Sequence, residues 1–312
     1  MTDVERFETL RPRLFEVAYR MLGTASDAED VVQDAWLRYS AAPSSGVGSP
    51  KAYLTTIVTR LCLDRLKSAR AQRETYVGPW LPEPILTDVR LLHEGPEQSL
   101  ALAESVTLAF MLLLETLTPE ERAVFLLREV FEYTHDEIAA MLGMTAAGCR
   151  QLLHRAKAHV AARRPRFRAA TEEKRQLVGR FVSALRQGNA EALTRVLAED
   201  VGLWGDGGGK VLAARRPVLG RTGVLNLLLG IRRTAPSAGI ALEDVALEIL
   251  DVNGEPAVVI RVAGEVDSVY ACAIADGAIT AIRVVRNPDK LAYLRRQLAD
   301  GQVTRDRRPP VA

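Results

Sequence analysis

A basic stretch near the middle of the sequence carries side chains that can recognise DNA bases. Between residues 146 and 168 there are seven Arg or Lys residues and no Asp or Glu. On a helix, residues separated by one, four and five positions share a face, and this spacing is shown by Arg150, Gln151, His154 and Arg155. Arg can bond guanine, Gln can bond adenine, and His can reach bases or phosphate. The face has the chemistry of major-groove recognition, and a solvated basic helix is the alternative.

The residues before this stretch predict an element that would present it to DNA. Thr134 and Glu137 have the spacing of a capping box, Gly143 marks a turn, and Thr145 caps a second helix. The inward residues of that helix are expected to be Cys149, Leu152, Leu153 and Ala156. Two helices joined by a short turn with Gly are typical of a helix-turn-helix, whose second helix enters the major groove. The residues beyond it that would contact phosphate or another surface are Arg163, Arg164, Arg166 and Arg168.

An upstream stripe is acidic and polar. Ser26 and Glu29 have the spacing of a capping box, which predicts a helix from there to about Tyr39. One face of this helix carries Asp30, Gln33, Asp34 and Leu37. Acidic faces do not attract DNA, so the functional interpretation is docking to a basic protein surface. A solvated helix face has the same spacing and remains the alternative.

The first half of the chain is predicted to be all helical. Apolar residues recur every three or four positions from Phe7 onward, and Gly23 ends that helix. Ser49 caps a third helix with Pro50 at its first position. This helix contains a basic run made of Arg60, Arg65, Lys67, Arg70 and Arg73. Residues 74–99 hold four Pro and two Gly without a sustained period, which predicts a linker.

The second half has a different pattern. One helix is expected over residues 177–197, followed by short alternating strands. Asn253–Gly254 and Asp276–Gly277 each separate two apolar runs, as in hairpins with mirror-type turns. These features predict an α+β domain with an antiparallel sheet. The apolar run 224–231 either lines a ligand cavity or packs on the sheet.

The glycine-rich segment 207–210 does not have the pattern of a phosphate loop. Trp204 stands where that pattern needs its first Gly, and Val211 follows the Lys in place of Ser or Thr. Asp206 beside Trp204 could act as a general acid or base if its pKa were raised, but no His follows His159. An Asp that heads a glycine turn is the simpler interpretation, so no catalytic residue is predicted.

Composition excludes several classes of protein. The 312 residues are 48% hydrophobic with a net charge of +2, which suits about two globular domains. Cys62, Cys149 and Cys272 form no CxxC pair, so neither a disulfide framework nor a thiolate metal site is expected, and a reducing compartment is favoured. A signal-peptide pattern and a membrane-spanning apolar run are also absent from the sequence. The expectation is a cytoplasmic protein without metal or cofactor.

Two segments of the first half resemble a known family. Residues 27–37, DAEDVVQDAWL, resemble region two of bacterial sigma factors of the extracytoplasmic-function type, and residues 117–122, LTPEER, with 153–157, LHRAK, resemble region four. The resemblance implies that the acidic face binds the clamp coiled coil of core RNA polymerase and that the basic face reads the −35 promoter element. It also implies that the loop 40–49, together with Thr56 and Arg60, holds the melted −10 element.

The rest of the chain resembles a particular group of these sigma factors. Its members carry a C-terminal SnoaL-like domain, the cone-shaped α+β fold of polyketide cyclases. The three motifs that carry the likeness are Trp80, Leu81 and Pro82 of WLPEP; Asp206, Gly207, Gly208, Gly209 and Lys210 of DGGGK; and Asn287, Pro288, Asp289 and Lys290 of NPDKL. The resemblance implies that this domain regulates the sigma regions in cis. We predict that it does so by packing on the linker and at least one sigma region through Asp206–Lys210 and Asn287–Lys290.

The predicted organisation is therefore a multidomain chain with an all-α sigma region two, a helix-turn-helix sigma region four and an α+β SnoaL-like domain. The expected boundaries are 1–73 for region two, 74–99 for the linker, 100–168 for region four, 171–300 for the SnoaL-like domain and 301–312 for a polar tail. The predicted function is promoter-specific transcription initiation with core polymerase. The alternatives are a one-component helix-turn-helix regulator with a SnoaL-like sensor, and a cyclase or isomerase tethered to DNA.

Overall fold

The structure is a computed structural model that describes residues 2–41, 49–87, 106–161 and 171–301. These residues divide into two compact units. The N-terminal unit contains the described residues of Met1–Tyr76, Trp80–Pro82 and Leu100–Arg166, and the C-terminal unit contains those of Val77–Pro79, Glu83–Ser99 and Phe167–Ala312. The linker thus contributes segments to both units. None of the described helices is long and apolar enough to cross a membrane.

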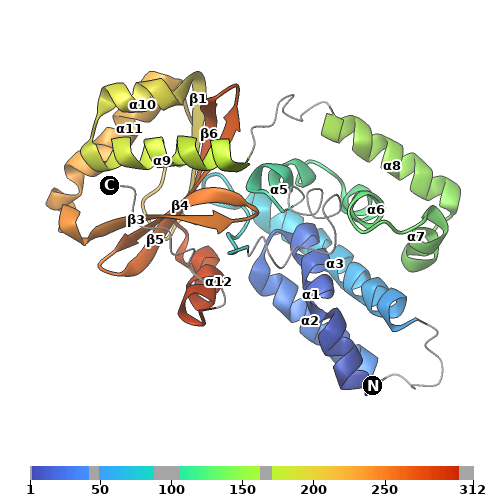
Figure 1. Cartoon of the computed structure of the whole chain (residues 1–312). Coiled ribbons are helices and arrows are strands. Elements are labelled where there is room, and N and C mark those ends of the chain that lie inside the picture. The colour runs from blue at the N-terminus through green and yellow to red at the C-terminus, as the bar shows by residue number, and fades with distance from the viewer. Residues whose placement is uncertain (1, 42–48, 88–105, 162–170, 302–312) are drawn as a thin grey trace. The chain divides into compact units, whose positions relative to one another are not determined.

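The first part of the N-terminal unit consists of α1 (Asp3–Leu22), α2 (Ala25–Ser40) and α3 (Pro50–Glu74) (Figure 1). The predicted end of α1 at Gly23 is confirmed, because Gly23 has φ +76°, the left-handed conformation that glycine favours. The predicted capping box at Ser26 is wrong. The helix α2 begins at Ala25 after Thr24, whose hydroxyl bonds the Asp27 carboxylate at 2.5 Å instead of a backbone amide. The sharp turn at Gly23 leaves only Gly23 and Thr24 between the two helices.

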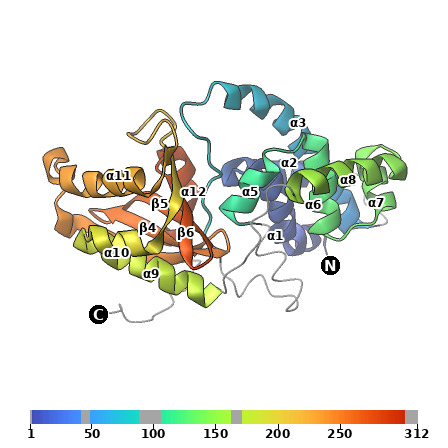
Figure 2. The ribbon, with the colours of Figure 1, turned by 90° about the horizontal axis from the view of Figure 1, so that it is seen from above.

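The second part of this unit contains α5 (Leu108–Leu114), α6 (Pro119–Glu129), α7 (His135–Leu142) and α8 (Ala146–Ala161). The capping box predicted at Thr134 is present, and Thr118 forms another with Glu121 at the start of α6. The helix α7 ends at Gly143, with φ +68°, and α8 begins after Thr145, whose hydroxyl accepts the Gly148 amide at 3.0 Å. The helices α7 and α8 lie side by side in both views (Figure 1, Figure 2). The predicted helix-turn-helix is therefore present.

The C-terminal unit contains a six-stranded sheet. Its strands are β1 (Leu197–Asp206), β2 (Val218–Leu219), β3 (Val245–Val252), β4 (Glu255–Val262), β5 (Glu265–Ala275) and β6 (Ala278–Val285), in the spatial order β2-β1-β6-β5-β4-β3. The two predicted hairpins are confirmed, with Asn253 and Asp276 both at positive φ. The predicted antiparallel pairing is present in four of the five strand pairs, and it is wrong only for β1 and β6, which run parallel. Alternation within a strand does not reveal the direction of its partner.

Helices cover both sides of this sheet. The helix predicted over residues 177–197 is two helices, α9 (Thr171–Gln187) and α10 (Ala190–Val196), because the chain turns at Gly188 and Asn189 caps α10. The run 224–231 lies in α11 (Arg221–Thr234) and packs on the sheet through Val224 and Leu228. The helix α12 (Pro288–Ala299) lies on the side away from α9, α10 and α11 (Figure 1). Short 3-10 helices occur at Pro236–Ala238 and Leu242–Asp244.

The end of the linker is built into the C-terminal unit. Leu86 forms an antiparallel bridge with Val252 at the edge of β3, and the Thr87 amide donates to the Asp251 carbonyl oxygen at 3.0 Å. The Leu86 amide also donates to Gln297 Oε1 on α12 at 2.8 Å. Residues 83–87 are buried. This segment therefore extends the sheet rather than crossing open solvent.

Candidate functional site

The predicted base-reading face of α8 is exposed to solvent, as the helical spacing of its residues predicts. All four of its residues are exposed and make no hydrogen bond or ion pair within the described chain: Arg150, Gln151, His154 and Arg155. On the opposite face Cys149, Leu153 and Ala156 are buried, and burial raises the pKa of the Cys149 thiol. Gly148 lies in the first turn of α8, where its amide bonds the cap, so it does not interrupt the helix interior. Residues 163, 164, 166 and 168 lie outside the described residues.

The two residues predicted to hold the −10 element lie on α3, and both are engaged within the N-terminal unit. Thr56 donates its hydroxyl proton to the Ala52 carbonyl oxygen of its own helix at 2.8 Å. Arg60 is exposed, yet its Nε donates to the Met141 carbonyl oxygen on α7 at 2.9 Å. A predicted DNA-contacting side chain is therefore bonded to the helix-turn-helix. Most of the predicted loop 40–49 lies outside the described residues, because residues 42–48 are not described.

Further bonds join α1 and α3 to the segment around α6. The hydroxyl groups of Thr55 and Tyr133 are 3.0 Å apart and buried. Arg13 Nη2 donates to the Phe131 carbonyl oxygen at 3.2 Å, and Arg122 Nη1 donates to the Met21 carbonyl oxygen at 2.6 Å. Burial lowers the pKa of Arg122 to about 10. Sequence reasoning missed these contacts, because their partners lie about 80 to 120 positions apart.

The acidic face of α2 is also exposed to solvent, and the Arg65 guanidinium lies beside its carboxylates. Asp30 and Gln33 are exposed, and Leu37 has 58% of its surface exposed. Arg65 on α3 lies 2.9 Å from an Asp27 oxygen, 3.5 Å from Asp30 Oδ2 and 3.7 Å from Asp34 Oδ2. The sequence placed Arg65 in a basic run but gave no sign that it meets these carboxylates. The face presents polar acid groups beside one exposed leucine, which suits docking to a basic surface.

The two C-terminal motifs pair with each other inside the C-terminal unit. Lys290 Nζ lies 2.7 Å from Asp206 Oδ2, and both side chains are almost fully buried. Asp206 also accepts the Gly208 amide, and its carbonyl oxygen accepts the amides of Arg286 and Asn287. Lys210 forms an exposed ion pair with Asp289. The segment 206–210 thereby connects the end of β1 to the start of α12, and these contacts have a structural role.

The WLPEP motif is divided between the units. Trp80 belongs to the N-terminal unit, where its ring packs so closely on Gly23 that a Cβ on Gly23 would lie 2.7 Å from Trp80 Cη2. Leu81 is only 2% exposed. Immediately before the motif, Val77 packs on Gly209 in the C-terminal unit. In the described part of the chain no group of three or more His, Cys, Asp or Glu is placed to hold a metal.

Comparison with known proteins identifies the class. The model of sigma-70 region 2 matches residues 6–72, and that of sigma-70 region 4 matches residues 107–160. The chain is 36% identical over 296 residues to the ECF RNA polymerase sigma factor SigJ of Mycobacterium tuberculosis (strain ATCC 25618 / H37Rv), covering 92% of this chain and 93% of SigJ. It is 32% identical over 301 residues to a probable ECF RNA polymerase sigma factor, SigI, of the same organism, covering 93% and 95% of the two chains.

A solved structure agrees with these matches. The crystal structure of Mycobacterium tuberculosis SigJ has a TM-score of 0.71 and 35% identity, and the match covers 93% of this chain and 98% of that chain. Sigma-70 regions 2 and 4 on one chain define a transcription initiation factor. The chain belongs to the extracytoplasmic-function RNA polymerase sigma factors. This confirms the prediction of a sigma factor over that of a one-component regulator, and the family implies binding to core polymerase and promoter DNA.

Proposed function

We propose that three separate surfaces carry out the steps of initiation. The acidic face of α2 (Asp30, Gln33, Asp34 and Leu37) docks on the clamp coiled coil of the largest polymerase subunit. The basic face of α8 (Arg150, Gln151, His154 and Arg155) reads the −35 element, and Thr56 and Arg60 hold the melted −10 strand. The exposure of the α2 and α8 faces supports the first two assignments. In this proposal the chain has no catalytic residue, acts in the cytoplasm and needs no cofactor.

In this proposal the N-terminal unit shows the arrangement of regions 2 and 4 before they bind a promoter. The supporting observation is the hydrogen bond from Arg60 on α3 to Met141 on α7. By their names, the −35 and −10 elements lie about 25 base pairs apart, which is roughly 85 Å of B-DNA at about 3.4 Å per base pair. The helix α8 spans only about 24 Å at about 1.5 Å per residue. A unit in which α3 touches α7 therefore cannot reach both elements, so regions 2 and 4 must separate on the promoter.

The C-terminal domain then controls this separation in cis. The linker supports this role, because Trp80 is anchored in the N-terminal unit whereas residues 83–87 extend the sheet of the C-terminal unit. A linker held in this way limits how far region 4 can move from region 2. The likeness of the domain to the SnoaL-like fold remains part of the proposal, and a regulatory role accounts for the motif residues without catalysis.

In vitro transcription with core polymerase on a promoter library tests the docking surface. Asp34→Arg and Gln33→Arg each place a positive charge against the expected basic surface, so binding to core polymerase should weaken by several kcal/mol. Glu8→Arg on α1 is a matched control, because Glu8 is also exposed but lies outside the acidic face. Equal binding by all three variants would remove the docking assignment. Failure of the wild-type chain to initiate on any promoter would remove the proposed function.

A further inference from the structure

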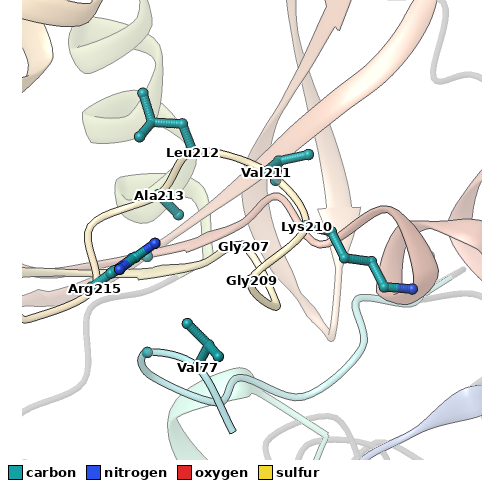
Figure 3. A pocket seen from close by; sticks show the side chains of 10 residues that line it. Val77, Gly207, Gly209, Lys210, Val211, Leu212, Ala213 and Arg215 are labelled. Atoms are coloured by element: carbon teal, nitrogen blue, oxygen red, sulfur yellow. The ribbon is translucent and has the colours of Figure 1, made fainter.

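A recess of about 260 Å³ opens in the C-terminal unit beside the glycine-rich turn that follows β1. Two parts of the chain that are distant in sequence form its walls. The linker contributes Val77 and Gly78, and the chain after β1 contributes Gly205, Gly207, Gly209, Lys210, Val211, Leu212, Ala213 and Arg215. Figure 3 shows Val77 on one wall and Arg215 on another. The recess is separate from the DNA-reading and acidic faces, and neither the sigma activity nor the paired motifs account for it.

Glycines make this recess possible. A Cβ on Gly207 would lie 2.4 Å from the Val211 carbonyl oxygen, so only glycine permits the chain to fold back at this point. A Cβ on Gly78 would approach the Cα of Arg215 to 3.6 Å, which shows that the linker backbone packs on that residue. Gly209 is similarly close to the Val77 side chain. The linker therefore forms a fitted wall of the recess.

The charge of the recess is positive. Two cations line it, but Lys210 is already paired with Asp289, and Figure 3 shows its ammonium directed away toward α12. Arg215 is exposed and makes no hydrogen bond or ion pair in the described part of the chain. Figure 3 shows its side chain running toward Gly207. Among the residues that the structure describes, no Asp or Glu lines the recess, so the Arg215 guanidinium has no carboxylate partner there.

The remaining lining selects the chemistry of an occupant. Guanidinium groups bind carboxylates through two parallel hydrogen bonds, and a single uncompensated cation matches a monoanion better than a phosphate dianion. Val77 and Ala213 add apolar surface beside this cation. Sites for drug-sized ligands begin at about 300 Å³, so the recess suits a smaller molecule, equal in volume to roughly nine waters at about 30 Å³ each.

We propose that this recess binds a small organic carboxylate. Arg215 holds the carboxylate group, and Val77 and Ala213 contact a short apolar body. Because Val77 and Gly78 belong to the linker, an occupant bridges the linker and the glycine-rich turn. Binding stabilises that contact and does not depend on promoter recognition, so its test stands apart from that of the transcription role.

Saturation-transfer NMR with the full chain tests the proposal, with sodium isovalerate as the probe and the neutral isovaleramide as its isosteric control. Isovalerate should bind in the millimolar range and isovaleramide at least ten-fold more weakly. Arg215→Ala should weaken isovalerate binding at least ten-fold, and Arg215→Lys should restore part of it. Arg216→Ala is the matched control, because Arg216 is exposed but does not line the recess; it should change binding less than two-fold.

Hydrogen exchange gives a second readout that does not rely on affinity alone. Isovalerate should slow exchange of the amides of Val77, Gly78 and residues 207–211 in the wild-type chain, and this protection should disappear in Arg215→Ala. Three results would overturn the proposal: equal binding of acid and amide, equal losses in the Arg215 and Arg216 variants, or protection confined to other segments. Tighter binding of inorganic phosphate than of isovalerate would overturn the assignment to carboxylates.

Discussion

Replacing Tyr133 by Phe is expected to loosen the contact between α3 and the segment that joins α6 to α7. The Tyr133 hydroxyl lies 3.0 Å from Thr55 Oγ1, and both residues are buried. A buried polar group that loses its partner costs about 1 to 3 kcal/mol. Thr55 lies on a helix, where its hydroxyl can turn to a carbonyl oxygen of the preceding turn, so the lower end, about 1 kcal/mol, applies. At about 1.4 kcal/mol per factor of ten, the compact arrangement should lose roughly five-fold in population.

A double-mutant cycle isolates this bond from the surrounding packing. Thr55→Val with Tyr133→Phe removes both polar groups, so the double variant should cost less than the sum of the single variants. The aromatic ring stays in place in Tyr133→Phe, and with it the contact of the Arg13 guanidinium, 6.0 Å from the ring centre. The change therefore concerns the hydroxyl pair alone.

Pulsed EPR between spin labels at Lys67→Cys and Ala158→Cys measures the two arrangements. Both positions are exposed, on α3 and α8. The native cysteines are buried, and burial raises the pKa values of their thiols, so labelling is selective for the introduced sites. Tyr133→Phe should increase the fraction of long distances. Unchanged distance distributions, or strictly additive effects in the cycle, would show that this bond does not hold the regions together.

Three further outcomes are expected. Arg150→Ala should lose about 1 to 3 kcal/mol of discrimination at one −35 base pair, measured by promoter-library transcription, while core binding survives; uniform weakening on all DNA would instead make Arg150 a phosphate contact. Deleting residues 171–312 should change the level of transcription strongly and leave the preferred promoter sequence unaltered, whereas trimming from Asp300 should have a smaller effect; unchanged initiation on every promoter would contradict control in cis. Burial raises the pKa of Cys272 to about 12, so iodoacetamide at pH 8 should modify Cys272 only after unfolding in urea, as peptide mass analysis would show; rapid modification of the folded chain would refute the buried placement.

Much of the local structure could be predicted because its causes are local. The capping box at Thr134, the turn at Gly143 and the hairpin at Asn253–Gly254 each depend on residues within four positions of one another. The two wrong predictions about helix boundaries, at Ser26 and at Gly188, both concern places where a glycine turns the chain. Ser26 has the spacing of a cap, but the chain already turns at Gly23, so the helix begins before Ser26 is reached. Periodicity alone did not show the break at Gly188, because apolar residues continue in phase on both sides of it.

The candidate surfaces likewise combine features that local helical spacing predicts with contacts that only the packing of distant helices creates. Helical spacing alone predicts that Arg150 and Gln151 share an exposed face with His154 and Arg155, and the structure displays them so. It does not predict that Arg65 meets three carboxylates of α2, since those contacts arise only when α3 packs beside α2. Nor does it predict that Arg60 bonds Met141, 81 positions away.

The sequence by itself thus determined the types of the helical elements, the two tight hairpins and the residues on each helix face, because backbone hydrogen bonding and side-chain periodicity act over a few residues. Only the tertiary structure decided which faces meet. The parallel pairing of β1 with β6, the joining of Asp206 to Lys290 across 84 positions and the linker wall of the recess all depend on the packing of distant segments. Such packing is a property of the whole folded unit, since burial of apolar surface is non-directional and selects partners by shape and charge rather than by separation along the chain.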